Sequence, residues 1–170
     1  MFSKKKKNKV SLTRPNHLKQ AFNPPAPNQV WTSDFSYIPI GKKTFVYLCV
    51  ILDLYSRKVI AWTVGATMNT RLAIQTVDKA IHSRKPMNSV LFHTDQGSQY
   101  TSLEFRKFIE NHPIVHSLSK PGYPWDNAVT EAFFKYMKKE ELNRRSFHSI
   151  EEKRWCSHPF FLLFFLDWPI

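Results

Sequence analysis

Residues 30–64 read VWTSDFSYIPIGKKTFVYLCVILDLYSRKVIAWTV, and this stretch decides the fold class. It contains three runs of apolar, β-branched and aromatic residues, separated by polar turns at residues 41–43 and 55–58. Runs of this kind joined by short turns are typical of an antiparallel meander. The middle run, TFVYLCVILDL, is apolar almost throughout, which indicates a strand that is covered on both faces.

Helical and strand patterns alternate after residue 65. Apolar residues at helical spacing predict a helix over residues 69–84, which Asn69 or Thr70 caps and which ends before Pro86. The remaining patterns predict a short strand at 89–92, a helix capped by Ser102 at 102–112, a strand at 114–118 and a last helix at 125–143. The order predicts an α/β fold with a mixed central sheet, in which three antiparallel strands are followed by alternating helices and strands.

Basic residues are concentrated near the N-terminus. The 170-residue chain has a formal charge of +12, and seven Lys and Arg residues precede the first acid, Asp34. This balance indicates a polyanionic partner, either nucleic acid or an anionic membrane surface, although a solvated leader that keeps the chain soluble has the same composition. At this length we expect one hydrophobic core, and hence one domain with tails.

The apolar runs and the cysteines indicate the cellular compartment in which the protein is expected. The longest apolar run, FFLLFFL at residues 160–166, has about a third of the length that a membrane span needs. No apolar stretch follows the N-terminal lysines, so a signal peptide is not expected. Cys49 and Cys156 alone form neither a disulfide framework nor a four-ligand zinc site. We therefore expect a reduced, cytoplasmic protein with no membrane partner.

Two acids in or beside the predicted strands are candidate functional residues. Asp95 follows the strand at 89–92 within HTDQGSQY (93–100), where Gly97 would permit a sharp turn that leaves little bulk over the carboxylate. Asp34 lies inside the first strand, among apolar residues. Each acid alone also has a structural explanation, because a lysine could pair with Asp34 and Asp95 could cap a turn or helix.

Glu131, in the last predicted helix, adds a third acid. On a helical wheel it belongs to a polar stripe, and the apolar residues opposite are Val129, Phe133, Tyr136 and Met137. A surface helix with an i, i+4 salt bridge to Lys135 would show the same pattern. Adjacent central strands could bring the first two acids together, and a helix packed on the sheet could present the third. Three crowded carboxylates repel one another unless cations lie between them, and oxygen-only ligation favours Mg²⁺ or Mn²⁺.

Four blocks of sequence carry a family resemblance: WTSDFSYI, LDLYSRKVIAW, HTDQGSQYTS and PWDNAVTEAFFKYMKKE. In this order, and with 35 residues between Asp95 and Glu131, the chain resembles the integrase-core transposases of bacterial insertion sequences, most of all the insertion sequence three group. The resemblance covers about residues 28–152. It implies the RNase H-like fold of retroviral integrase catalytic cores, with Asp34, Asp95 and Glu131 as catalytic acids that bind two Mg²⁺ or Mn²⁺ ions.

The resemblance also implies an activity and partners. The activity would be metal-dependent cleavage of element-end DNA followed by strand transfer into target DNA, with no protein nucleophile, in a chain that acts as a homo-oligomer. The residues expected to contact DNA are Gln99, Lys120, Asn127, Lys135, Lys138 and Lys139, together with the basic residues that precede Asp34. Lysine contacts to phosphate would give a salt-dependent affinity that is largely independent of sequence, although each lysine is equally compatible with solvated surface.

The chain departs from the family pattern at both ends. The family carries a helix-turn-helix region before its linker, whereas this chain starts with a basic, proline-rich linker at residues 1–27, and the catalytic core spans residues 28–152. Residues 153–170 read KRWCSHPFFLLFFLDWPI, an atypical tail that a frameshift near residue 152 would explain. We therefore expect a truncated transposase. Two alternatives stay open: an inactive remnant that only binds DNA, and an RNase H-like nuclease.

Overall fold

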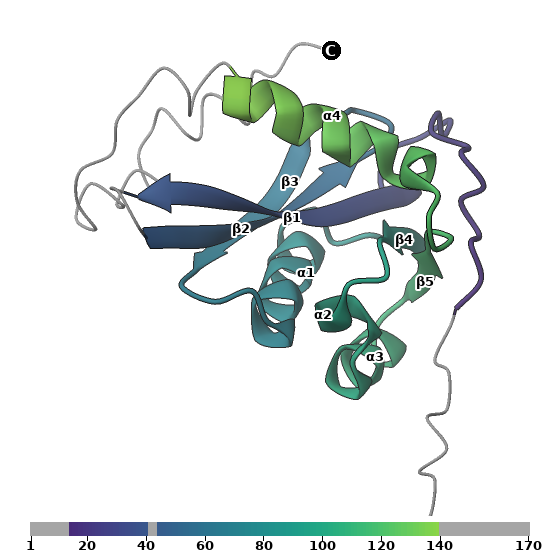
Figure 1. Ribbon diagram of the computed structural model, residues 1–170. Coiled ribbons are helices and arrows are strands. Elements are labelled where there is room, and N and C mark those ends of the chain that lie inside the picture. Colours follow the sequence, from purple (N-terminus) through teal and green to yellow (C-terminus); the bar gives the residue numbers. More distant parts are fainter. Residues whose placement is uncertain (1–13, 41–43, 140–170) are drawn as a thin grey trace, which may run out of the picture.

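The computed structural model describes residues 14–40 and 44–139, which build one mixed sheet with the strand order β3-β2-β1-β4-β5 (Figure 1). The strands are β1 (Val30–Ile40), β2 (Thr44–Asp53), β3 (Val59–Gly65), β4 (Val90–Thr94) and β5 (Ile114–Leu118). β1, β2 and β3 pair in antiparallel order, whereas β4 lies parallel to both β1 and β5. The predicted meander and mixed sheet are confirmed.

Helices cover both faces of this sheet. Figure 1 shows α1 (Thr70–Arg84), α2 (Ser98–Thr101) and α3 (Leu103–Glu110) on one face and α4 (Ala128–Met137) on the other. Asn69 caps α1 by accepting a hydrogen bond from Leu72 N at 2.9 Å, and Ser102 caps α3 by accepting one from Phe105 N at 3.1 Å. Among the described helices, none is long and apolar enough to cross a membrane.

Two predicted helix boundaries differ from the structure. The short helix α2 precedes α3, because Ser102 has extended backbone dihedrals and separates the two. The last helix begins at Ala128 rather than at Trp125, since a short 3₁₀ helix, η1 (Pro124–Asn127), forms the turn before it. Proline is well tolerated in the first turn of a helix, which explains why Pro124 opens η1. The predicted end of the last helix, at residue 143, lies outside the described residues.

Side chains that alternate along β2 supply two cores, one on each face of the sheet. The core beneath α4 contains Ile38, Val46, Leu48, Val50, Leu52, Val59, Phe133, Phe134 and Met137. The core beneath α1, α2 and α3 includes Trp31, Ile51, Ala73, Val77, Phe92, Tyr100, Phe105 and Ile109. Because Asp34 pairs with Val50 in the β1–β2 register, its side chain leaves the sheet on the face that α4 covers.

The apolar face predicted for the last helix is partly wrong. Phe133 and Met137 are buried as expected, but Tyr136 is 51% exposed and Phe134 is buried in its place. The buried stripe consists of Thr130, Phe133, Phe134 and Met137, at i, i+3, i+4 and i+7 spacing. Because Thr130 is polar, the hydrophobic pattern does not include it among the buried positions. The predicted apolar stripe is therefore centred nearer Tyr136 than the buried stripe of the structure.

An N-terminal arm (residues 14–29) contains no helix or strand and lies against the core (Figure 1). Leu18 is buried in a small cluster with Val30 and Leu54. The backbone N–H groups of His17 and Leu18 donate to Ser117 Oγ on β5, at 2.9 and 3.3 Å. Half of the predicted linker therefore packs on the fold. Residues 1–13 and the tail at 153–170 lie outside the described residues, and the domain boundaries stay a prediction.

Candidate active site

The parallel pairing of β1 with β4 brings Asp34 and Asp95 side by side. The register aligns Ser33 with Thr94, the last residue of β4, so Asp34 and Asp95 are the next residues along. Asp95 Oδ1 accepts a hydrogen bond from Gly97 N at 3.0 Å. A Cβ atom on residue 97 would overlap the side-chain amide of Gln99 and lie 3.0 Å from Asp95 Oδ1. The absence of a side chain at Gly97 therefore leaves room for the Gln99 amide beside Asp95.

Buried hydroxyl groups attach the start of α4 to β1. Thr32 Oγ1 donates to Asn127 Oδ1 at 2.9 Å and shares a hydrogen bond with Thr130 Oγ1 at 2.7 Å. All three side chains are buried, so these bonds are shielded from competing water. Thr32 lies two residues before Asp34, and Thr130 lies one before Glu131. The attachment therefore sets the position of Glu131 relative to the sheet.

The three acids all line one open cavity of about 520 Å³. This acid cavity is lined by Asp34, Asp95, Gln96, Gly97, Ser119, Lys120, Pro121, Gly122, Tyr123, Asn127 and Glu131. Gly122 has a positive φ of 76°, and nothing lies within 4 Å of the position that a Cβ would occupy. The loop over the acids therefore uses a conformation that suits glycine and leaves the space above it open.

The acids of this cavity interact electrostatically. The pKa of Asp34 is raised to about 7, chiefly by burial and next by the charge of Asp95, with a smaller contribution from Glu131. The Phe35 N–H group, 2.7 Å from Asp34 Oδ1, and the Lys138 ammonium both lower the pKa of Asp34. The net effect is a carboxyl group that resists ionisation near neutral pH.

A hard divalent cation suits this donor set. Within residues 14–40 and 44–139, no three His, Cys, Asp or Glu side chains already stand in an arrangement that holds a metal ion. The three acids nevertheless share one cavity and offer only oxygen donors, and the charges of Asp95 and Glu131 add to burial in raising the pKa of Asp34. A cation between them would relieve that repulsion, so these residues could hold Mg²⁺ or Mn²⁺.

Three of the residues predicted to contact DNA lie at or beside the acid cavity. Lys120 and Asn127 line it, and the Lys120 ammonium lies 5.7 Å from the centroid of the Tyr123 ring. Lys138 is half-buried, with its ammonium 4.2 Å from the centroid of the Tyr37 ring, and its charge acts on Asp34. Lys120 and Lys138 therefore lie close to the acids.

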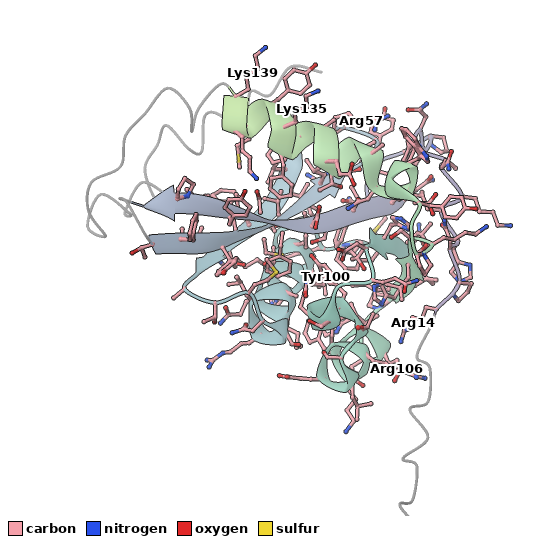
Figure 2. The ribbon with its side chains drawn as sticks, viewed as in Figure 1. Arg14, Arg57, Tyr100, Arg106, Lys135 and Lys139 are labelled. Atoms are coloured by element: carbon pink, nitrogen blue, oxygen red, sulfur yellow. The ribbon has the colours of Figure 1, made fainter. Side chains whose placement is uncertain are left out.

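The other three predicted contacts lie away from the cavity lining. Lys135 and Lys139 are exposed on the outer side of α4, pointing away from the sheet (Figure 2). Gln99 is 8% exposed, and its side chain folds back over Gly97. The structure therefore does not bring all six residues to one surface.

Two buried polar residues near the acids were missed in the sequence. Ser33 Oγ lies 2.8 Å from the hydroxyl oxygen of Tyr100, and this hydrogen bond links α2 to β1. Asp126 is 2% exposed and accepts hydrogen bonds from the arm and from Lys120 N. A serine inside an apolar strand and an acid beside Asn127 were the signals available in the sequence.

The sheet, its two helical layers and the carboxylate cavity define an RNase H-like catalytic core of the integrase and transposase class. The catalytic domain of Mos1 mariner transposase has the same fold, with a TM-score of 0.63 and 21% identity over 78% of this chain and 70% of that one. A chain of the simian T-cell lymphotropic virus intasome gives a TM-score of 0.63 and 22% identity, over 86% of this chain and 46% of that one.

Residues 24–124 match the integrase core domain, and the chain belongs to that family. The transposase for insertion sequence element IS904 of Lactococcus lactis is 38% identical over 143 residues, which cover 84% of this chain and 56% of the relative. Transposase InsF for insertion sequence IS3A of Escherichia coli is 36% identical over 139 residues, which cover 82% of this chain and 48% of the relative. The resemblance to the insertion sequence three group is confirmed, and the chain spans about half the length of these curated relatives.

Proposed function

We propose that this chain is the catalytic core of a DNA transposase, which cleaves DNA strands and joins them to a target. The observation that carries this proposal is the acid cavity, where Asp34, Asp95 and Glu131 meet from β1, the end of β4 and α4. Burial and, after it, the charges of Asp95 and Glu131 raise the pKa of Asp34, and such crowding of carboxylates is typical of sites that hold a cation.

Each part of the site has a task in this reaction. Asp34, Asp95 and Glu131 would hold two Mg²⁺ or Mn²⁺ ions, which would supply charge neutralisation at the phosphate and an activated water or DNA 3′-hydroxyl. Asn127 and the hydroxyl groups of Thr32 and Thr130 orient α4. The magnesium complexes solved for the human T-lymphotropic virus 2 integrase core and for the Mos1 catalytic domain support the choice of metal.

DNA is the proposed partner. Lys120, Asn127 and Lys138 would contact the strand at the acids, whereas Lys135 and Lys139 on outer α4 would meet a second DNA segment. The buried side chain of Gln99 would support Gly97 rather than touch DNA directly. We also propose action as a homo-oligomer in the cytoplasm, where bacterial DNA lies. The dimeric and trimeric forms solved for the human T-lymphotropic virus 2 core support oligomerisation.

A strand-transfer assay tests the function. The full chain is mixed with a labelled duplex that carries an end of the encoding element, with unlabelled target duplex, and with Mg²⁺ or Mn²⁺. We expect shortened and joined labelled products. Because loss of an outer partner of a metal site already costs about 10- to 100-fold, Glu131→Gln should lower the rate at least about 100-fold. Glu104→Gln, at an exposed acid on α3, is the matched control and should leave the rate unchanged.

The same assay separates the alternatives. DNA binding without cleavage under either metal would identify a remnant that only binds DNA, and would contradict the proposal. Hydrolysis without joined products would identify a nuclease, and would contradict the strand-transfer half of it.

A further inference from the structure

A second groove, of about 850 Å³, adjoins the acid cavity. This arm groove is lined by Arg14, Pro15, Asn16, Lys19, Gln20, Gln96, Leu118, Ser119, Lys120, Pro121, Tyr123 and Asp126. The residues that it shares with the acid cavity are Gln96, Ser119, Lys120, Pro121 and Tyr123. Because the two hollows share these walls, an extended ligand could lie in both at once.

Hydrogen bonds to the side chain of Asp126 hold the wall of the arm groove together. The carboxylate of Asp126 accepts hydrogen bonds from Asn16 Nδ2 at 2.7 Å, from Gln20 Nε2 at 3.2 Å and from Lys120 N at 3.0 Å. Burial raises the pKa of Asp126, but the bonds from Lys120 N and Gln20 and the charges of His93 and Lys120 outweigh it, and the pKa lies below its ordinary value. A single buried carboxylate thus attaches the arm to the loop over the acids.

The turn of the arm is held in an unusual conformation. Lys19 and Gln20 have positive φ values of 46° and 62°, and Lys19 N donates to Asn16 Oδ1 at 2.9 Å. A left-handed backbone is unfavourable for a residue other than glycine. The contacts of Asn16 and Gln20 with Asp126 offset this cost. The result is a fixed turn that presents the exposed side chain of Lys19 at the groove.

The charge of the arm groove is positive. Its basic lining residues are Arg14, Lys19 and Lys120, and Asp126 is the single acid among the residues that line it. Asp126 is 2% exposed and already accepts three hydrogen bonds, so little of its charge faces a ligand. Arg14 Nη2 lies 3.2 Å from Glu110 Oε1 on α3, and this ion pair fixes the guanidinium at the groove.

An aromatic ring marks the junction of the two hollows. Tyr123 lines both of them, is 54% exposed and lies beside the Lys120 ammonium. An exposed ring next to a cation is the combination that binds a nucleic-acid strand, because the ring stacks with a base and the cation pairs with phosphate.

We propose that the arm groove binds the sugar-phosphate backbone of the DNA strand that continues from the phosphate in the acid cavity. The inference rests on the proposed function and extends it. It assigns Lys19 and Arg14 to phosphates, Tyr123 to a base, and Asp126 to positioning the arm. Two observations favour this ligand. The lining of the arm groove is positively charged, which suits a polyanion, and the groove is continuous with the acid cavity, where we propose that a phosphodiester reacts.

Binding measured in a salt series tests the groove. A fluorescein-labelled duplex with a single-stranded 3′ extension is titrated with the full chain in chelator, so that no cleavage occurs. Loss of one phosphate contact lowers the slope of log K against log salt by about 1. Lys19→Gln should show this change and bind several-fold more weakly. The matched control is Lys79→Gln, at an exposed lysine on α1, which should keep the slope and affinity of the parent chain. Equal slopes for the Lys19→Gln variant and the parent would overturn the proposal.

Photocrosslinking of the unmodified chain gives an independent measurement. A strand with 5-iodouracil in the extension is irradiated on the protein, and crosslinked peptides are identified by mass spectrometry. We expect crosslinks at Tyr123 and within the arm, and crosslinks confined to α4 would contradict the groove. Both measurements omit metal, so they remain readable if the chain cuts no DNA. Conversely, a Lys19→Gln variant that cuts and binds like the parent would reject the groove and leave the proposed function intact.

Discussion

Asp34 is the residue at which burial and function oppose each other most directly. Its position inside β1 gives it a register partner in Val50 and a place on the face that α4 covers. The same position raises its pKa from 3.8 to about 7, through burial and the neighbouring charge of Asp95. Sequence placed the acid among apolar residues and predicted that it needs a partner. Its shared cavity with two other acids is a property of the folded chain.

Replacement of Asp34 by Asn should stabilise the metal-free fold at alkaline pH. A folded-state pKa near 7 against 3.8 in the unfolded chain stabilises the fold below about pH 4, and this contribution is lost as the pH rises through about 7. One pKa unit corresponds to about 1.4 kcal/mol, so Asp34→Asn should raise the free energy of unfolding by about 1–4 kcal/mol at about pH 8. The gain should vanish near pH 4.

Urea denaturation followed by circular dichroism, in chelator and at both pH values, measures this difference. A variant less stable than the parent at about pH 8 would show that the pKa of Asp34 is not raised in the folded chain. Asp78→Asn, at a half-buried acid on α1 away from the cavity, provides the comparison.

At the scale of elements, α4 carries both a core face and Glu131. Its stripe of Thr130, Phe133, Phe134 and Met137 packs on the sheet, and Thr130 also shares a hydrogen bond with Thr32. The sequence predicted this helix and its acid, but the stripe was misplaced because a buried threonine has no apolar signature. The identity of its hydroxyl partner depends on which strand lies beneath the helix.

Thr130→Val should affect catalysis more than stability. The change keeps the shape of the side chain and removes one buried hydrogen bond, which should lower the free energy of unfolding by about 1 kcal/mol. Because Glu131 is the next residue, the cleavage rate at saturating metal should fall by about tenfold or more.

Thr76→Val is the matched control, since Thr76 is equally buried, donates to Leu72 O at 2.8 Å and lies on α1 beneath the opposite face. It should lose similar stability and keep its cleavage rate. Equal losses of rate in the two variants would attribute the effect to stability alone.

At the scale of the whole molecule, the sheet is the middle of three layers. Helices cover both faces, and Cys49 on β2 is fully buried between them. Its sulfur lies 3.7 Å from both Ser33 Oγ and the hydroxyl oxygen of Tyr100, and burial raises the pKa of its thiol to about 11. Such a thiol becomes reactive only when the layers separate.

Thiol labelling should therefore report global unfolding. In a Cys156→Ser background, we expect Cys49 to resist a thiol reagent in buffer and to react in step with the urea unfolding transition. Ser89→Cys, at an exposed loop position, should react at once in the native state. Rapid labelling of Cys49 without denaturant would mean that α1 and α2 open independently of the rest.

The sequence by itself determined the meander, the alternation of helices and strands, and the spacing of the three acids. Each of these features follows from a local hydrophobic pattern or from a short motif. The tertiary structure decided which of these elements meet. The alignment of Ser33 with Thr94 places Asp34 beside Asp95, and the Asp126 carboxylate holds Gln20 from 106 residues away. Contacts of this kind depend on long-range packing and strand pairing, whose energies are shared among many residues. No local pattern records them, and the arm that reads as a linker becomes the wall of a groove only in the folded chain.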